Sequence, residues 1–390
     1  MAKQGEENKL MEGRNWTDIP EDLLETILSS LYLKDVQRFH LVCKTWQSVA
    51  DPKFHHPLRY PVVESQWLVQ KIYDEDKCKF FHPLYGDRYC VDIPELRDAY
   101  IRYSKDGWLF MSRDDYEIFF YNPFSNAKIE LPDLPSRCFF RGVTFTSTPT
   151  SYGCMVFGFS ASFEDSVTIF TIKCGDEDWI EKEFENNLPI FPSHCNPIFH
   201  NEKFYILGKN GNIGVYDPKD EHWTVLDNPE KLNEYIYENY LVDCDGDLMA
   251  VFVASTGSQI SVYKLDELKM DWEEVNDLGD HMFFLSIRNS FSRKSVIDVM
   301  KNKIYFPRFH GKYCVFYSLD TRMYETFGSG FSKDSLFDTA ELSHCCWIEP
   351  REDDYSEEQL DWFYDSSNAS DDIDHSADSS TDDDNSEGES

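Results

Sequence analysis

The 390-residue sequence predicts an α+β multidomain fold, with a small helical unit, a long all-β region and an acidic tail. Apolar residues recur at helical spacing mainly within the first sixty residues, whereas short runs of Tyr, Phe, Val and Ile dominate after residue 60. Such aromatic and β-branched runs are typical of strands. The last forty residues are rich in Asp and Ser and poor in apolar side chains, which predicts disorder.

The helical unit is predicted to begin at Pro20, because proline suits the first turn of a helix. Glu21 and Asp22 follow, where carboxylates favour the positive helix end. The apolar stripe of this helix consists of Leu24, Ile27, Leu28 and Leu31. Their spacing of i, i+3, i+4 and i+7 places them on one face.

A second helical stretch follows, and Asp51 and Pro52 end it. Its apolar residues near one face are Val36, Phe39, Cys43, Trp46 and Ala50. Periodicity alone leaves two interpretations open. The stripes pack on one another and on the next domain, or their surplus forms a docking surface for a partner helix bundle.

The segment from Trp16 to Ala50 resembles the plant F-box. The resemblance rests on an Ile-Pro opening, the helix DLLETILSSL, a Lys-Asp turn and the closing motif VCKTW. Tyr32 replaces a small capping residue, and His40 and Gln47 replace frequent arginines. The resemblance implies a three-helix F-box at residues 16–56 that binds the Skp-type adaptor of a cullin-RING ubiquitin ligase. The implied adaptor contacts are Ile19, Pro20, Leu23, Leu24, Ile27, Leu28, Leu31, Val42, Cys43 and Trp46, with Trp46 as the anchor.

Residues 60–350 contain a degenerate repeat. The copies at residues 105–135 and 201–229 both consist of a strand, a turn, a strand that ends in Tyr, an Asn-Pro or Asp-Pro turn and a further strand. The repeats start near residues 106, 153, 202, 245 and 302, and a first unit is placed at residues 80–103. Repeats of this length are typical of propeller blades with four strands. The region is therefore predicted to be a kelch-like β-propeller of about six blades.

The repeated residues are predicted to have structural roles. Tyr121 and Tyr216 are expected to pack between blades, and the Asn or Asp before each proline to form the turn. The residues expected to supply hairpin freedom are Gly107, Gly211 and Gly246, and those expected to pack between blades are Trp179, Trp223 and Trp272.

The whole chain resembles plant F-box proteins that carry the domain of unknown function numbered 295. This resemblance implies a non-catalytic substrate-recognition subunit of a ubiquitin ligase of the Skp-cullin-F-box type, whose propeller binds an unidentified target protein. Two alternatives remain open: an interaction scaffold outside any ligase, and a propeller enzyme. The sequence has no GxSxG, P-loop, HExxH or GxGxxG motif, so we expect neither catalysis nor a cofactor.

Charge and cysteine usage exclude several classes of partner. The net charge is −35, so nucleic acid and anionic membranes are not expected as partners. The eleven cysteines form no CxxC pair, and Cys345 and Cys346 beside His344 lack a second ligand pair at zinc-finger spacing, so we expect reduced thiols and no metal. The N-terminus has no apolar signal sequence, which predicts a protein of the cytoplasm or nucleus.

The two ends of the chain, residues 1–15 and 351–390, are predicted to be disordered. The acidic tail has two interpretations: a solvated extension that promotes solubility, or an acidic segment for basic partners that phosphorylation tunes. The candidate phosphorylation sites, each with an acid three residues on, are Ser379, Ser380, Thr381 and Ser386.

Overall fold

The structure is a computed structural model that describes most of the chain between residues 16 and 363. The residues outside the description are 1–15, 17–18, 29–37, 50–65, 73–74, 85, 87, 115, 136–139, 164, 227–235, 255–258, 268, 270, 296, 328–341, 343, 352–354 and 364–390. The predicted disorder of the leader and of the last 27 residues, and the predicted contact Leu31, lie outside the described residues.

The helical unit contains α1 (Glu21–Leu28), a helical stretch at residues 38–40 and α3 (Lys44–Val49). The first helix begins as predicted, because the carbonyl oxygen of Pro20 accepts from the backbone N–H groups of Leu23 and Leu24, both at 3.1 Å. A small core holds the helices together and comprises Leu24, Leu28, Phe39, Trp46 and Val49. The apolar stripes therefore pack on one another.

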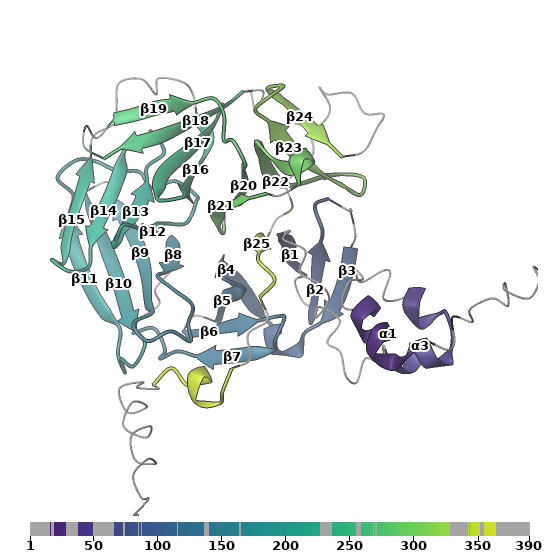
Figure 1. Cartoon of the computed structure of the whole chain (residues 1–390). Helices are drawn as coiled ribbons and strands as arrows, with labels where there is room; N and C mark the ends of the chain where they lie inside the picture. The colour runs from purple at the N-terminus through teal and green to yellow at the C-terminus, as the bar shows by residue number, and fades with distance from the viewer. Residues whose placement is uncertain are drawn as a thin grey trace, which may run out of the picture.

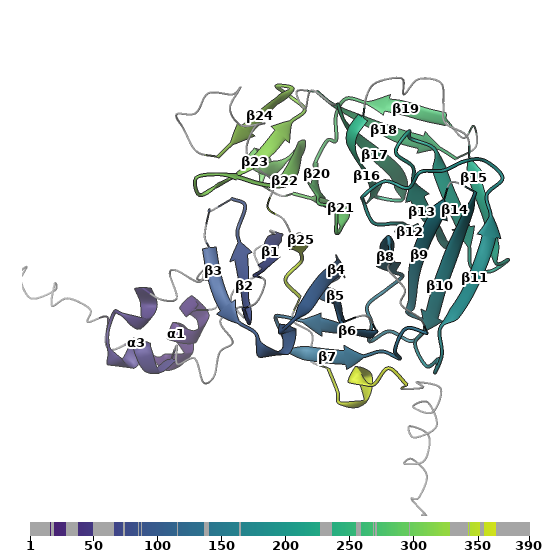
Figure 2. The same cartoon turned by 180° about the vertical axis from the view of Figure 1, so that it is seen from behind.

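Six sheets form a ring, as Figures 1 and 2 show from opposite sides. The predicted propeller of about six blades is confirmed. In chain order the blades comprise β1 (Trp67–Lys71), β2 (Lys77–Phe81) and β3 (Arg88–Asp92); β4 (Ala99–Lys105), β5 (Trp108–Arg113), β6 (Glu117–Asn122) and β7 (Ala127–Glu130); β8 (Gly142–Phe145), β9 (Met155–Phe163), β10 (Ser166–Lys173) and β11 (Ile180–Glu185); β12 (Ile198–His200), β13 (Lys203–Leu207), β14 (Ile213–Asp217) and β15 (His222–Leu226); β16 (Ile236–Cys244), β17 (Asp247–Ala254), β18 (Ile260–Asp266) and β19 (Asp271–Val275); and β20 (His281–Leu285), β21 (Ser290–Lys294), β22 (Lys303–His310), β23 (Tyr313–Ser318) and β24 (Met323–Thr326).

The ring is closed by a strand from the far end of the chain. β25 (Cys345–Ile348) pairs antiparallel with β1, with Leu68 opposite Trp347. This sheet has the order β25-β1-β2-β3. The first blade therefore begins at β1, earlier than residue 80, which is where the sequence predicted its start. Pairing between the two ends of the propeller makes its closure depend on contacts that are remote in sequence.

Three blades begin with the same hairpin, between the innermost strand and the next. The central residues of these hairpins are Asp106-Gly107, Asn201-Glu202 and Asp245-Gly246. All six have φ between 44° and 85°, which defines type I′ turns and explains the choice of Gly, Asn and Asp. Three of the five predicted repeats start at these turns. These repeats therefore begin one strand later than their blades.

The turn between the third and fourth strands also recurs. The Asn122 Oδ1 accepts from the backbone N–H of Phe124 at 2.9 Å, and the Asp217 Oδ1 accepts from that of Lys219 at 3.0 Å. The predicted turn role of Asn122 and Asp217 is confirmed. Asp266, for which no such role was predicted, accepts at its Oδ1 from the N–H of Lys269 at 3.1 Å.

Tryptophans join neighbouring blades, as the sequence predicts. Each indole Nε1 donates toward the preceding blade: Trp179 to the Pro132 oxygen at 2.9 Å, Trp223 to the Asn186 Oδ1 at 2.8 Å and Trp272 to the Gly211 oxygen at 3.3 Å. Tyr121 and Tyr216 are also buried in clusters that span two blades. These contacts make the ring rigid around its central channel.

The sixth blade has five strands in the order β21-β20-β22-β23-β24. β20 pairs antiparallel with β21 and parallel with β22. The added strand places β21 at the channel, beside β16 of the fifth blade. The loop at residues 286–289 joins β20 to β21 and so reaches the channel as well.

The start of the predicted tail is ordered. Trp362 is 2% exposed, and its ring stacks 6.1 Å from that of Phe120. Its carbonyl oxygen accepts from the backbone N–H of Gly175 at 2.9 Å, and Tyr355 lies 5.3 Å from Trp108. The prediction of disorder from residue 351 is therefore wrong for residues 355–363, because a few apolar side chains within the acidic run anchor it below β6 and β7 (Figure 1).

Candidate functional sites

The surface of the helical unit divides the implied adaptor contacts into two groups. Leu24, Leu28 and Trp46 are buried in the core of the unit. Leu23 and Val42 are 53% and 51% exposed. Pro20 is exposed, and the partly buried members are Ile19, Ile27 and Cys43. Their role in adaptor binding stays a prediction, but only the exposed and partly buried members are accessible to a partner.

Two further apolar side chains on this unit face solvent. Trp16 is 68% exposed and Leu41 is 83% exposed. The ring of Trp16 lies 6.4 Å from that of Trp46, which itself packs 4.4 Å from the ring of Phe39. Sequence reasoning placed Trp16 in the motif but named neither residue as a contact. Helical spacing carries no signal for them, because neither lies within an α-helix.

The centre of the propeller is tied together by two buried asparagines. The Asn196 Nδ2 donates to the carbonyl oxygens of Arg102 and Arg288, both at 2.7 Å, and its Oδ1 accepts from the N–H of Val143 at 3.0 Å. Arg102 and Arg288 belong to blades two positions away on either side. One side-chain amide therefore links its own blade to three others, which requires that it lie near the ring axis.

Asn289 makes the second link. Its Nδ2 donates to the carbonyl oxygens of Ser104 at 3.1 Å and Trp347 at 2.6 Å, and its Oδ1 accepts from the N–H of Trp347 at 3.0 Å. Both asparagines end a Ser-x-x-Asn sequence, at residues 193–196 and 286–289. Sequence reasoning missed this short repeat, which is the one signal that could have identified them.

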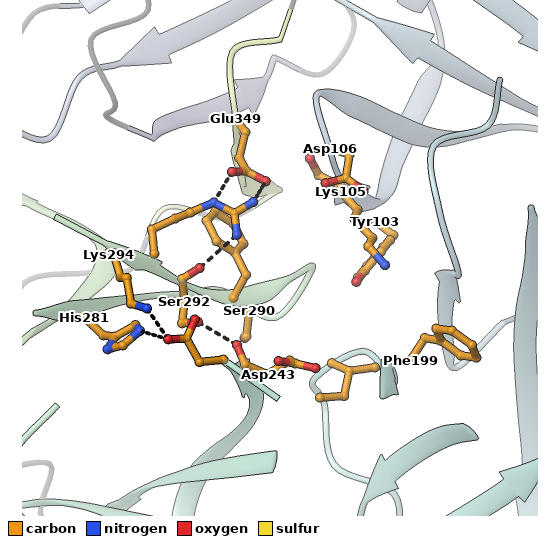
Figure 3. Close-up of a pocket in the computed structure, with 15 residues that line it drawn as sticks. Tyr103, Lys105, Asp106, Phe199, Asp243, His281, Ser290, Ser292, Lys294 and Glu349 are labelled. Atoms are coloured by element: carbon orange, nitrogen blue, oxygen red, sulfur yellow. Dashed lines mark hydrogen bonds and ion pairs between the residues drawn. The ribbon is translucent and has the colours of Figure 1, made fainter. Parts of the chain in front are cut away.

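A cavity of about 500 Å³ lies on the side of the channel where the innermost strands end (Figure 3). We call it the hairpin-side pocket. Its lining residues are Tyr103, Ser104, Lys105, Asp106, Ile198, Phe199, Asp243, Asp245, His281, Ser290, Phe291, Ser292, Arg293, Lys294 and Glu349. Cavities of this size suit a small molecule or an inserted side chain.

Charged groups in the hairpin-side pocket are held in fixed positions. Arg293 forms a two-point ion pair with Glu349, and burial raises the pKa of that carboxyl against the effect of the arginine. Asp245 contacts Lys294 and the His281 Nε2, the latter at 3.2 Å. Figure 3 shows these pairs on one side of the pocket and Lys105 on another.

Lys105 has no carboxylate bound to it among the described residues. Its Nζ donates to the carbonyl oxygens of Phe145 at 3.3 Å and Thr146 at 2.7 Å. Burial lowers the pKa of Lys105. Two serine hydroxyls of the pocket are also engaged by the backbone, since the Ser292 Oγ donates to the Asp243 carbonyl oxygen at 2.7 Å and the Ser290 Oγ to that of Ser286 at 3.4 Å. This arrangement suits recognition of charge more than nucleophilic catalysis.

A buried histidine supports one wall of this pocket. The His200 Nδ1 lies 2.6 Å from the Asp243 Oδ2, and its Nε2 lies 3.1 Å from the Glu267 Oε1. Burial alone lowers the pKa of His200, but the two carboxylates outweigh burial and raise it. Burial also opposes ionisation of Asp243, yet His200 holds the pKa of this carboxyl below its usual value.

A second cavity, of about 210 Å³, opens on the opposite side of the channel. We call it the loop-side pocket. It is lined by Ser193, His194, Cys195, Lys209, Glu238, Asn239, Tyr240 and Ile287. Asn196 lies between Cys195 of the loop-side pocket and Ile198 of the hairpin-side pocket. Asn289 likewise lies between Ile287 and Ser290, so both asparagines separate the two cavities.

The described residues give no support to a metal or membrane site. They contain no cluster of three or more His, Cys, Asp or Glu side chains with metal-binding geometry. The ten cysteines in this part of the chain are free thiols, and Cys345 and Cys346 belong to different apolar clusters on the two faces of β25. No helix in the described ranges has the length and apolar character needed to cross a bilayer.

A small helical unit followed by a six-bladed ring defines the class of F-box propeller proteins. Residues 16–56 match the F-box domain, and residues 80–325 match the KIB1-4 beta-propeller. The chain belongs to this family of plant F-box proteins with a KIB1-4 beta-propeller.

Curated relatives come from Arabidopsis thaliana. F-box/kelch-repeat protein At1g57790 is 31% identical over 354 residues, which cover 86% of this chain and 94% of the relative. F-box protein At4g00893 is 30% identical over 329 residues, which cover 80% of this chain and 81% of the relative. The predicted resemblance to plant F-box proteins with a kelch-like propeller is confirmed.

Proposed function

We propose that this chain is the substrate-recognition subunit of a ubiquitin ligase of the Skp-cullin-F-box type. The exposed apolar side chains of the helical unit carry this proposal. Trp16, Leu23, Leu41 and Val42 are each more than half exposed, although the unit has a complete core of its own. Apolar groups that a small unit leaves in solvent support a protein interface, and an F-box generally uses such a surface for the Skp-type adaptor.

The ligase role needs no catalytic group in this chain. The adaptor and cullin bring the charged conjugating enzyme, and the propeller holds a target protein close to it. Binding thereby raises the effective concentration of target lysines. A non-catalytic receptor of this kind would act in the cytoplasm or nucleus.

We further propose that the target contacts the hairpin-side pocket. Its charges are held by ion pairs on the inner strands, as between Arg293 and Glu349. Little side-chain conformational entropy is therefore lost on binding. Lys105 has one N–H beyond the two that its backbone acceptors use. It can therefore receive an acceptor group from a bound segment.

Binding to a purified plant Skp-type adaptor tests the docking half of the proposal. Leu23→Asp and Val42→Asp place charges on exposed positions, so they should each weaken binding at least about tenfold without unfolding the chain, a loss of about 1.4 kcal/mol. Gln47→Asp is the matched control, because Gln47 is exposed and polar on α3. Wild-type chain that does not bind the adaptor, or full binding by both variants, would overturn the proposal.

Affinity capture under proteasome inhibition tests the target half. Proteins captured by the Leu23→Asp chain should persist without inhibitor, because that chain binds targets but not the ligase. Lys105→Met should lose the same proteins. Capture that is unchanged by Lys105→Met would contradict the assignment of the pocket while leaving adaptor docking untouched.

A further inference from the structure

A basic surface surrounds the loop-side pocket. Its exposed members are Arg141, Phe191, His194, Lys209 and Ile287, and Arg288 is half-buried beside them. We call these six residues the basic patch. Hydrogen bonds bring three of them to the same loop, because the Arg141 Nη2 donates to the Pro192 oxygen at 2.9 Å and the backbone N–H of Lys209 donates to the Phe191 oxygen at 2.7 Å.

The cations of the basic patch lack carboxylate partners. No ion pair involves Arg141, Lys209 or Arg288 within the described part of the chain, and the buried Nε of Arg288 has no hydrogen-bond acceptor there. The one carboxylate that lines the pocket, Glu238, accepts from the Tyr240 hydroxyl at 2.9 Å and lies 3.7 Å from Arg308. The patch therefore keeps a surplus of positive charge.

Several outer cations of the propeller are paired with carboxylates instead. Lys264 pairs with Asp247 at 2.7 Å, Lys128 pairs with Glu130 at 2.7 Å, and Lys219 pairs with Glu202. In a chain with a net charge of −35, three neighbouring cations with no ion pair among the described residues favour anion binding beside an apolar rim. Phe191 and Ile287, which are 47% and 37% exposed, add apolar contact area.

We propose that the basic patch binds the acidic tail of this same chain, residues 364–390. The tail carries ten Asp or Glu residues and no Lys or Arg, so its charge is opposite to that of the patch. Ile373 and Ala377 give it apolar groups as well. The structure also fixes where the tail begins, because Trp362 is buried against Phe120 and bonded to Gly175.

The tail is long enough to reach the patch. Its 27 residues span up to roughly 90 Å when extended, whereas a domain of this size is about 50 Å across. Tethering at Trp362 gives the tail an effective concentration of about 1 mM near the propeller surface. Weak ion pairs are therefore enough to keep the patch occupied, and a free acidic segment of another protein would have to compete with the tail.

Zero-length cross-linking of the full chain with a carbodiimide tests this inference. The reagent joins a carboxylate to a nearby lysine, and Lys209 is the lysine of the patch. We expect amide links from Lys209 to residues 364–390 at least about fivefold above those from the outer lysines Lys219 and Lys264. Raising NaCl from 0.1 M to 1 M should abolish this excess, because the Debye length falls from about 10 Å to about 3 Å.

Two controls separate the patch from general charge effects. Arg141→Ala with Arg288→Ala should lower the Lys209 links at least threefold, whereas Lys219→Ala with Lys264→Ala, which removes the same charge, should leave them unchanged. A mixture of ¹⁵N-labelled and unlabelled chains reports which copy supplies the tail. Links between labelled and unlabelled chains, or a Lys209 yield no higher than that of the outer lysines, would overturn the proposal.

Discussion

The indole Nε1 of Trp46 donates a hydrogen bond of 2.9 Å to the backbone carbonyl oxygen of Trp16. This bond ties the start of the F-box to its last described helix. Trp46 is only 8% exposed and packs against Phe39, so it belongs to the core of the helical unit. Trp46, which the motif suggests as the adaptor anchor, therefore stabilises the fold of the helical unit.

Replacement of Trp46 by alanine should unfold the helical unit. Loss of a buried tryptophan costs about 3–5 kcal/mol, which is about as much as the whole core of a unit of this size is expected to supply. Hydrogen exchange should show residues 19–49 unprotected while β17 stays protected. Gln47→Ala is the control. A protected unit that nevertheless fails to bind the adaptor would show instead that Trp46 contacts the adaptor directly.

The propeller could be predicted from the sequence because its turns have local sequence signals. Asp106-Gly107 and Asp245-Gly246 indicate hairpins, and Asn122 indicates the turn between the third and fourth strands, so the number of blades follows from the spacing of these turns. The closing strand β25 and the links of Asn289 could not be predicted in this way. Leu68 and Trp347 pair across two adjacent strands, although almost the whole propeller sequence separates them. No local sequence pattern predicts that pairing.

The helical unit shows the same division. Periodicity identifies Leu24 and Leu28 as members of one stripe, but it does not say whether that stripe faces a core or a partner. Only the packing against Phe39 decides this.

Residues 355–363 were predicted to be disordered because composition averages over a window of residues. The anchoring effect of the apolar side chain of Trp362 is not visible in that average among the surrounding acidic residues.

Replacement of Asn289 should destabilise the whole propeller. Asn289→Ala leaves the carbonyl oxygen of Ser104 and the backbone groups of Trp347 without their partners in the buried channel. Each unsatisfied group costs about 1–3 kcal/mol, so with three such groups we expect a loss of at least about 3 kcal/mol in the free energy of unfolding. Urea unfolding followed by tryptophan fluorescence measures this loss.

Asn276→Ala provides the matched control for Asn289. Asn276 is exposed and accepts one hydrogen bond from Arg322 at 2.6 Å. Its replacement should change the free energy of unfolding by less than about 0.5 kcal/mol. Equal effects of the two substitutions would mean that the channel asparagine does not hold the blades together.

Replacement of Trp362 should release the segment at residues 355–363 without opening the ring. The ring closes through β25, which precedes this segment and does not depend on it. Trp362→Ala should therefore speed hydrogen exchange at the Gly175 amide, which donates to the Trp362 oxygen, by at least tenfold. Phe363→Ala is the control, because Phe363 is 52% exposed. An unchanged Gly175 amide would show that the segment is held by other contacts.

The buried His200 should make the stability of the propeller depend on pH. Its pKa is raised in the folded chain by Asp243 and Glu267, so the protonated form stabilises the fold. This contribution is complete below the unfolded pKa of about 6.5 and is lost as pH rises through the higher folded pKa. Wild-type chain should therefore lose stability between about pH 6 and 8 relative to His200→Asn, which cannot titrate. Asp243→Asn should shrink this difference, since it removes one of the two carboxylates. Urea midpoints of the three chains across this pH range measure it, and a wild-type profile parallel to that of His200→Asn would show that folding leaves the pKa of His200 unchanged.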